Sequence, residues 1–277
     1  MKPFRSLLFV PGIRPERFAK AIASGADAVC IDLEDAVPPH EKAAARAAVL
    51  EFIAALPENR LCDIGVRINP LGTQDGQNDI DAFYASATVS DFIMVPKAIS
   101  AEALKALPVS LDAPDVPIWA VIETIDGLMN AISLAKACAP AGGILFGGAD
   151  FSAEIGTTMH WEPLFYARSL LATQARIAPL TLLDVPYLDV NNREGLRLEC
   201  ERVQALGFNG KACIHPNQVA VVNAVFTPSQ DIIEWAKRVG AAQEQSQSGA
   251  VLLDGKLLDA PVYLRAQRIR QQAGIEN

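Results

Sequence analysis

The chain alternates between short apolar runs and longer segments whose apolar residues recur every three or four positions. Many of the short runs lie between glycines and prolines, which is typical of strands buried on both faces of a parallel sheet. The longer segments have the period of helices that pack on one side. We expect eight strands, at Ser6–Gly12, Ala28–Asp35, Asp63–Asn69, Phe92–Lys97, Pro117–Thr124, Gly143–Phe151, Thr181–Asp189 and Lys211–His215.

Eight strand-then-helix units predict an α/β protein with the TIM (β/α)8 barrel fold, because right-handed parallel crossovers of this number close a barrel. No G-x-G-x-x-G follows the first strand, which disfavours a dinucleotide-binding fold. We expect residues 1–228 to form the catalytic barrel and residues 229–277 to form a helical C-terminal extension. This extension begins with a helix at about Ser229–Gln245 and continues into the polar tract Ser246–Gly249. Its apolar residues must pack on the barrel or on a neighbouring subunit, as a lid or an oligomer contact.

Composition restricts the partners and the compartment. No run of 18 apolar residues is present to span a bilayer, and the first residues lack a signal-peptide pattern. The net charge of −8 argues against a nucleic-acid partner. The five cysteines are scattered without a C-x-x-C pair, and the three histidines do not have zinc-ligand spacing. We therefore expect a cytoplasmic protein with buried, reduced thiols that binds neither membranes nor nucleic acids.

Charged residues close several of the apolar runs, at the end of a barrel strand where TIM-barrel active sites lie. Glu123 and Asp150 close the fifth and sixth runs, which are neighbours in a barrel. Two carboxylates so placed would share a cation, and oxygen ligands with open positions suit Mg²⁺, with Mn²⁺ as the alternative. In the competing interpretation, one of them caps a helix or pairs with Lys97.

Arg67 closes the third run and has the chemistry of a bidentate carboxylate clamp. Alternatively it forms an ion pair with Glu34 or Asp35. These two acids either hold metal-bound water or act as counter-ions for Arg67 and Lys97. Gly147 and Gly148 would let a substrate carboxylate approach backbone N–H groups closely.

Basic residues of the first helix allow two interpretations. Arg14, Arg17 and Lys20 form either a solvated helix face or a binding surface for a phosphate-rich ligand arm. His215, just before Pro216, is either a general base or a histidine that is hydrogen-bonded in the barrel wall.

Eight short motifs, in order from about residue 4 to residue 265, resemble the citrate lyase β-subunit family. That family belongs to the HpcH/HpaI aldolase superfamily and includes malyl-CoA and citramalyl-CoA lyases. The motifs are Phe9-Val10-Pro11-Gly12, Asp32-Leu33-Glu34-Asp35-Ala36-Val37, Arg67-Ile68-Asn69, Val95-Pro96-Lys97, Glu123-Thr124, Gly147-Gly148-Ala149-Asp150-Phe151, Gly210-Lys211-Ala212-Cys213-Ile214-His215-Pro216 and Leu258-Asp259-Ala260-Pro261.

The resemblance implies a Mg²⁺-dependent carbon–carbon lyase that acts on 3-hydroxyacyl thioesters, usually as a homotrimer or hexamer. By position, Glu123 and Asp150 match the metal ligands, Arg67 matches the substrate clamp, and Asp259 matches an acid/base that a neighbouring subunit supplies. We place the substrate at Arg67, Gly148, Glu34, Asp35 and Lys97. We place the coenzyme A part at Phe9, Arg14, Lys20, Ile214 and His215. The chain departs from its relatives at Ala149, where they often carry an acid, and at Glu16, where some carry a base.

Two other functions compete with this one. A pyruvate-type class II aldolase would cleave 4-hydroxy-2-oxo acids and would need no thioester, but the motif around Asp259 and the helix with Arg14 and Lys20 favour a thioester. A citrate lyase β-subunit would act on a citryl-carrier protein, which an acidic barrel would meet poorly. The products of the favoured reaction are a thioester and a 2-oxo acid, and the substrate is a citramalyl, malyl or citryl thioester.

Overall fold

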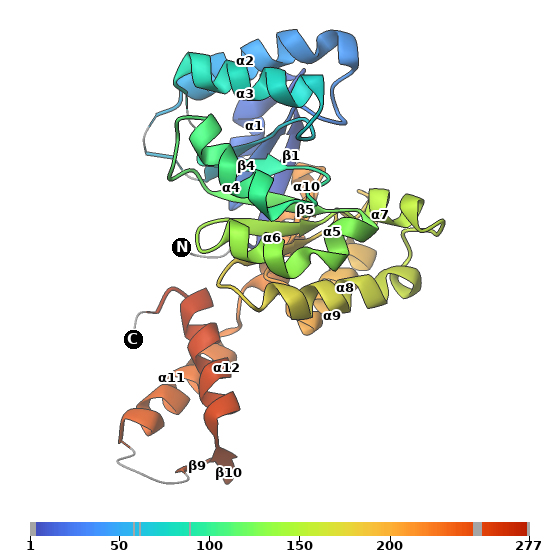
Figure 1. Ribbon diagram of the computed structural model, residues 1–277. Coiled ribbons are helices and arrows are strands. Elements are labelled where there is room, and N and C mark those ends of the chain that lie inside the picture. The colour runs from blue at the N-terminus through green and yellow to red at the C-terminus, as the bar shows by residue number, and fades with distance from the viewer. Residues whose placement is uncertain (1–3, 58, 61, 89, 246–250, 276–277) are drawn as a thin grey trace.

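The computed structural model describes residues 4–275, except residues 58, 61, 89 and 246–250. Its eight parallel strands pair in sequence order, and the last pairs with the first, so the sheet closes into a barrel (Figure 1). This confirms the predicted (β/α)8 fold. The strands are β1 Ser6–Pro11, β2 Ala28–Asp32, β3 Asp63–Arg67, β4 Phe92–Val95, β5 Ile118–Ile122, β6 Gly143–Phe146, β7 Thr181–Asp184 and β8 Gly210–Cys213.

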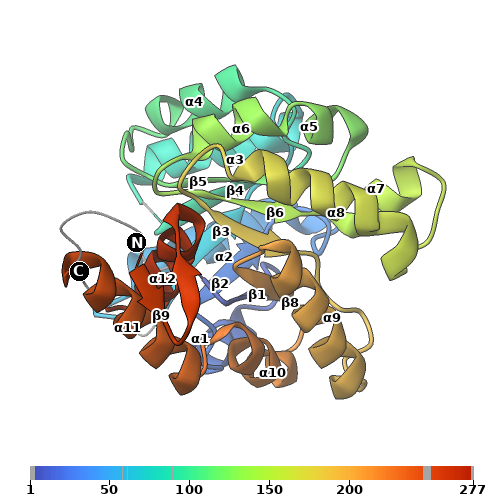
Figure 2. The same cartoon turned by 90° about the horizontal axis from the view of Figure 1, so that it is seen from below.

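Helices pack around the outside of this barrel (Figures 1 and 2). Polar side chains begin several of them: Ser100 and Asn192 cap their helices and accept hydrogen bonds from the third backbone N–H of each. The α-helices are α1 Phe18–Ile22, α2 Lys42–Ala54, α3 Gln74–Ser86, α4 Ala101–Ser110, α5 Ile125–Met129, α6 Ala131–Cys138, α7 Gly148–Glu154, α8 Trp161–Ala175, α9 Arg193–Leu206 and α10 Pro216–Phe226. Two short 3-10 turns, Pro15–Arg17 and Pro39–Glu41, precede α1 and α2.

Alternation along the strands separates two cores. Inward side chains fill the barrel, where Phe4 stacks on Trp119 with ring centroids 5.3 Å apart. Glycines make room for the largest rings, since a Cβ at Gly65 or at Gly143 would lie within 2.6 Å of Phe92 or Trp119. Outward side chains pack against the helices and form the larger core. The barrel is therefore a filled scaffold, and its site lies at the rim.

The strands end earlier than expected, which changes where one key residue lies. The sixth strand stops at Phe146, and the chain turns at Gly147 into α7, so that Asp150 lies in the first turn of a helix. The expectation of a strand through Phe151 was wrong because Phe151 is buried like a strand residue. Its ring packs 5.6 Å from that of Phe146, but from the helix.

The predicted helical extension is present and has its own small core. We call residues 230–275 the C-terminal module: α11 Gln230–Gln245, the antiparallel hairpin of β9 Val251–Leu253 and β10 Lys256–Leu258, and α12 Ala260–Gln272. The hairpin was not predicted, and the tract Ser246–Gly249 lies outside the described residues. The division of the chain at residue 228 stays a prediction.

The C-terminal module lies beyond the amino-terminal end of the barrel. Arg176 follows α8 near the start of β7, and its pKa is lowered by burial and by the charge of Arg268 on α12. Figure 1 shows the module projecting from the barrel, with the hairpin at its far end. The module therefore lies away from the opposite, carboxyl-terminal rim of its own barrel.

All five cysteines are buried and free, as expected. Among the described residues, no helix is both long enough and apolar enough to cross a membrane.

Candidate functional site

Seven charged residues gather at the carboxyl-terminal rim of the barrel, and we call them the rim cluster. They are Asp32, Glu34, Asp35, Arg67, Lys97, Glu123 and Asp150. They come from the ends of β2 to β5 and from α7. The structure thus brings together six predicted site residues and adds Asp32.

Arg67 is held chiefly by Asp32. Its Nε and Nη2 donate to the two Asp32 carboxylate oxygens over 2.7 and 2.6 Å, while Nη1 lies 2.9 Å from Glu34 Oε2 and 3.6 Å from Asp35. The expected partners are present, but the main one was missed because Asp32 lies inside an apolar run. Register could have found it, since β2 and β3 pair Asp32 directly with Arg67.

These contacts make Arg67 a fixed cation. Burial opposes its charge, but the hydrogen bonds and charge of Asp32 raise its pKa above the ordinary value. The guanidinium lies over the ring of Phe9, 5.1 Å from the centroid, as in a cation–π contact. A bidentate guanidinium that is clamped in this way keeps a single orientation toward a ligand.

Lys97 contacts three carboxylates. Its ammonium is 2.9 Å from Glu34 Oε1 and 3.5 Å from Asp150 Oδ2, and its backbone N–H donates to Glu123 Oε1 over 2.7 Å. The competing interpretation that one acid pairs with Lys97 therefore holds for Asp150. A cation at a half-exposed acid does not prevent that acid from also binding a metal.

Glu123 is the most perturbed acid of the cluster. Burial raises its pKa to about 8, and the charges of Glu34 and Asp150 add to the shift, whereas the N–H of Lys97 acts in the opposite direction. Burial also raises the pKa of Glu34. A buried carboxylate among other acids gains most from a nearby divalent cation.

The donor set fits such a cation. Five carboxyl groups face only two cations, Arg67 and Lys97, so the cluster has an excess of negative charge. Glu123 and Asp150 supply hard oxygen donors, and among the described residues no three Asp, Glu, His or Cys side chains are arranged so that they could hold a metal ion together. Mg²⁺ suits a site with few protein ligands because it keeps waters and admits substrate oxygens.

The remaining predicted residues lie outside the cluster or at its edge. Gly148 is buried and begins α7, next to Asp150. Arg14 and Lys20 are exposed, and Arg14 lies 3.8 Å from Glu16. Ile214 is also exposed. None of these positions conflicts with contact to a bound thioester arm.

His215 and Asp259 both begin helices. His215 accepts a hydrogen bond from the Asn217 backbone and caps α10, so it is an exposed cap and not a residue bonded in the wall. Asp259 accepts from the Val262 N–H at the start of α12, in the C-terminal module. The structure therefore does not bring Asp259 to the rim cluster of its own chain.

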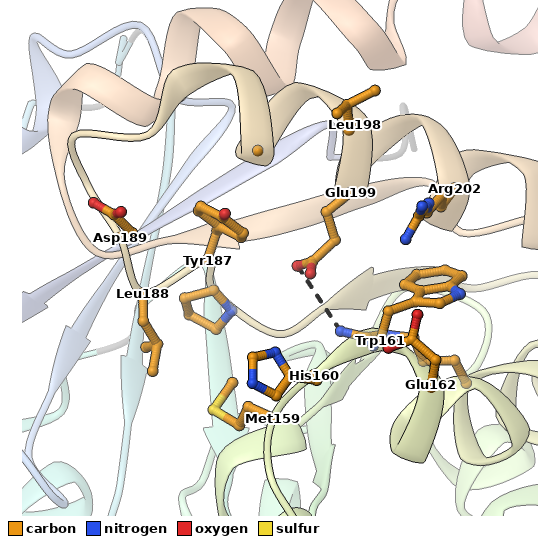
Figure 3. Close-up of a pocket in the computed structure, with 13 residues that line it drawn as sticks. Met159, His160, Trp161, Glu162, Tyr187, Leu188, Asp189, Leu198, Glu199 and Arg202 are labelled. Carbon is orange, nitrogen blue, oxygen red and sulfur yellow. Dashed lines mark ion pairs between the residues drawn. The ribbon is translucent and has the colours of Figure 1, made fainter.

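A separate cavity of about 500 Å³ lies between α8 and α9 (Figure 3). The Trp161 ring forms one wall, with the guanidinium groups of Arg168 and Arg202 5.0 and 5.5 Å from its centroid. Arg168 belongs to a buried ion network with Asp184, Lys211 and Glu199, which joins the barrel wall to these two helices. No member of the rim cluster lines this cavity.

Comparison with known proteins identifies the family. The family model for HpcH/HpaI aldolase/citrate lyase matches residues 5–216, most of the chain. The chain belongs to this family. The membership confirms the resemblance that the motifs indicated and the predicted class of carbon–carbon lyase.

Individual relatives cover nearly the whole length. A (3S)-malyl-CoA thioesterase of Cereibacter sphaeroides is 37% identical over 93% of this chain and 90% of its own. The L-malyl-CoA/beta-methylmalyl-CoA lyase of the same organism is 32% identical, over 98% and 95%. A crystal structure of CitE from Mycobacterium tuberculosis with magnesium, acetoacetate and coenzyme A has a TM-score of 0.79 at 34% identity, covering 98% of each chain.

Proposed function

We propose that this protein is a Mg²⁺-dependent lyase that converts a 3-hydroxyacyl-CoA thioester into a shorter acyl-CoA and a 2-oxo acid, or catalyses the reverse condensation. The observation that carries the proposal is the rim cluster, in which Glu123 lies within electrostatic reach of both Asp150 and the fixed cation Arg67. The related CitE structure with magnesium, acetoacetate and coenzyme A supports this chemistry.

Glu123 and Asp150 would hold the metal ion. When bound, Mg²⁺, or Mn²⁺ in its place, supplies a Lewis acid for the oxygens of the hydroxy acid. The high pKa of Glu123 means that the carboxyl must lose its proton to become a ligand.

Arg67 would bind the carboxylate of the 2-oxo acid portion. Its guanidinium is already oriented by Asp32 and Glu34, so little reorganisation accompanies substrate binding or the development of negative charge. Gly147 and Gly148 lie at the start of α7 and have no side chains, so a substrate carboxylate could approach the backbone N–H groups there.

Cleavage breaks the bond between the hydroxyl-bearing carbon and the carbon next to the thioester. The hydroxyl group gives its proton to solvent water and becomes the carbonyl of the 2-oxo acid, while the two electrons of the broken bond form a thioester enolate. The enolate carbon then accepts a proton, which we assign to Asp259 of a neighbouring subunit because the C-terminal module lies at the far end of its own barrel. This assignment requires an oligomer, for which we propose a homotrimer or hexamer.

The coenzyme A arm would lie across the loops after β1 and β8. These strands are hydrogen-bonded neighbours, so the segment with Arg14 and Lys20 follows one of them and Ile214 and His215 follow the other. Arg14 and Lys20 are exposed and offer positive charge to its phosphates. Phe9 lies nearer the centre of the barrel, against Arg67, at the reacting end of such a ligand.

Thioester hydrolysis is a second candidate, favoured by the 37% identity to a (3S)-malyl-CoA thioesterase. Hydrolysis would consume water and release free coenzyme A with the intact hydroxy acid. Its products therefore distinguish it from cleavage of the carbon–carbon bond.

A substrate panel tests the proposal. The full-length protein is incubated with malyl-CoA, citramalyl-CoA, citryl-CoA, a citryl-carrier protein or a 4-hydroxy-2-oxo acid, with Mg²⁺ or with EDTA. We measure 2-oxo acid and free thiol separately, and expect Mg²⁺-dependent 2-oxo acid without free thiol. Free thiol alone would indicate a hydrolase, and cleavage of a 4-hydroxy-2-oxo acid in place of every thioester would indicate a pyruvate-type aldolase.

A further inference from the structure

Lys97 has a backbone conformation that is unusual for a lysine. It follows Pro96 in the turn after β4 and has φ of +49°, in the left-handed region that Gly and Asn normally occupy after a turn proline. Among the described residues, the other non-glycine positions with positive φ are Ala87, Asp112 and Asp254, none of which belongs to the rim cluster. Strain of this kind is retained where the surroundings require it.

The backbone N–H of this left-handed residue donates a hydrogen bond to one oxygen of Glu123. The donor lies 2.7 Å from Oε1. The other side of Glu123 borders Gly147, where a Cβ would lie 2.6 Å from Oε2 and 2.4 Å from the Glu123 Cβ. The carboxylate is therefore fixed between a hydrogen-bond donor and a backbone that only glycine allows so close.

The side chain of Lys97 acts on two other acids. Its ammonium is 2.9 Å from Glu34 Oε1 and 3.5 Å from Asp150 Oδ2. Gly or Asn would adopt the same backbone conformation with less strain, but neither carries a positive charge. Both functions together account for a lysine at this position.

We infer that Lys97 is a positioning residue for the metal site, with two parts that act on metal affinity in opposite directions. The inference rests on the proposed ligation of Mg²⁺ by Glu123 and Asp150. The backbone N–H holds Glu123 in the orientation of a ligand and so strengthens binding. The ammonium is a competing cation at Asp150 and weakens binding, while it keeps the acids together.

Three substitutions separate the two parts. Lys97→Met removes the positive charge but keeps a long unbranched side chain, so the positive φ is about as unfavourable as in the unchanged protein. Lys97→Gly removes the charge and favours positive φ. Lys97→Val removes the charge, and its β-branched side chain strongly disfavours positive φ. Each full-length variant is titrated with MgCl₂ by calorimetry in the absence of substrate, and circular dichroism checks the fold.

We expect Lys97→Met and Lys97→Gly to bind Mg²⁺ about two- to fivefold more tightly than the unchanged protein, the range of a half-exposed ion pair. Lys97→Val should bind about tenfold more weakly than Lys97→Met, because a hydrogen bond to a charged acceptor is lost. A general loss of stability would move all three variants in the same direction, so opposite shifts identify positioning.

Two results would overturn the inference. Equal affinities of Lys97→Val and Lys97→Met would show that the backbone conformation does not orient Glu123, and no gain for Lys97→Met would show that the ammonium does not compete. If Lys97→Val does not fold, the Mg²⁺ affinity of Lys97→Ala is compared with that of Lys97→Gly. Alanine also disfavours positive φ but less strongly than valine, so the expected difference has the same sign and is smaller. Glu123→Gln is the control for the proposed function: if it binds Mg²⁺ like the unchanged protein, the metal assignment itself fails.

Discussion

The barrel and the C-terminal module differ in how far each buries its apolar side chains and pairs its charges within one chain. The barrel buries two large apolar clusters and pairs the charges of its rim within one chain. Among the described residues of the module, the buried core consists of Ala236, Val239, Leu258 and Ala266. The module also leaves Leu252, Leu257 and Leu264 about half exposed or more. Asp259, the remaining predicted catalytic residue, lies on the less complete of the two regions.

This difference indicates a division of roles. A rim that is built from strand ends and buried ion pairs is rigid before substrate arrives, so it suits metal binding and charge stabilisation. A small module with exposed leucines has apolar surface to bury against another surface. The module would gain burial in an oligomer and would deliver Asp259 there, which the following predictions test.

Substitutions at the proposed metal ligands in the barrel should have the largest effect. Glu123→Gln or Asp150→Asn should lower Mg²⁺-dependent cleavage by about 1,000-fold or more, because each removes one of the two protein ligands that we propose for the metal ion. Initial rates of 2-oxo acid formation at saturating Mg²⁺ measure this effect.

The fold should survive both substitutions, because neither residue packs in the apolar clusters. Asp126→Asn, an acid at the start of α5 outside the rim cluster, is the matched control and should keep full activity. Full activity of Glu123→Gln or Asp150→Asn in EDTA would refute the metal assignment.

Substitution of Asp259 in the C-terminal module should lower activity somewhat less. Asp259→Ala should reduce turnover about 100- to 1,000-fold through loss of a positioned acid/base, while Mg²⁺ affinity stays unchanged. Truncation after Gln245 should have the same result and leave a folded, metal-binding barrel.

Mixing two inactive variants sharpens the prediction. Oligomers that contain both Asp259→Ala and Arg67→Ala subunits have some sites with an intact rim and an intact neighbouring Asp259, so part of the activity should return. Mass spectrometry first establishes that subunits exchange. If activity does not return after exchange, Asp259 does not act between subunits.

Arg67→Lys should impair turnover about 100-fold although the charge is kept. A lysine cannot reproduce the two parallel hydrogen bonds to Asp32 and still reach Glu34 and a substrate carboxylate. Steady-state kinetics on the best substrate of the panel measure the loss. Arg60→Lys, at an arginine outside the rim cluster that also pairs with an aspartate, is the control. Unchanged kinetics for Arg67→Lys would make Arg67 a structural partner of Asp32 only.

The sequence was sufficient to predict the barrel, because continuous apolar runs mark strands that are buried on both faces, and a period near 3.6 marks helices that are buried on one face. It also predicted most of the rim cluster, since charges that end parallel strands must meet at one rim. Pairing partners were harder to predict. Asp32 was missed because an acid in Ala28–Asp32 is unremarkable until β2 and β3 are placed in register.

Other features depend on backbone geometry that side-chain patterns do not encode. The early end of β6 at Phe146 depends on two glycines and on a Phe151 ring that packs inward from a helix. The positive φ of Lys97 has no periodic signal at all. The β9–β10 hairpin, in contrast, has a turn signal that was missed: Asp254-Gly255, both at positive φ, between two apolar runs. The position of Asp259 relative to a partner subunit is a property of the assembly, which a single chain does not determine.

The smallest predicted effect concerns pH. It tests whether burial and the neighbouring acids of the rim cluster destabilise the ionised form of Glu123. An unfolded glutamate ionises near its ordinary pKa, but burial and the charges of Glu34 and Asp150 raise the pKa of Glu123 to about 8. Between these two values the folded state binds more protons than the unfolded state, so this group makes stability fall as pH rises. In EDTA, the Tm of the unchanged protein should therefore fall by a few degrees relative to that of Glu123→Gln between pH 5 and pH 8.

Mg²⁺ favours the ionised carboxylate, so the Mg²⁺-induced rise in Tm should be larger at pH 9 than at pH 6. Thermal unfolding across this range measures both effects, and parallel Tm curves for the two proteins would show that Glu123 is ionised throughout.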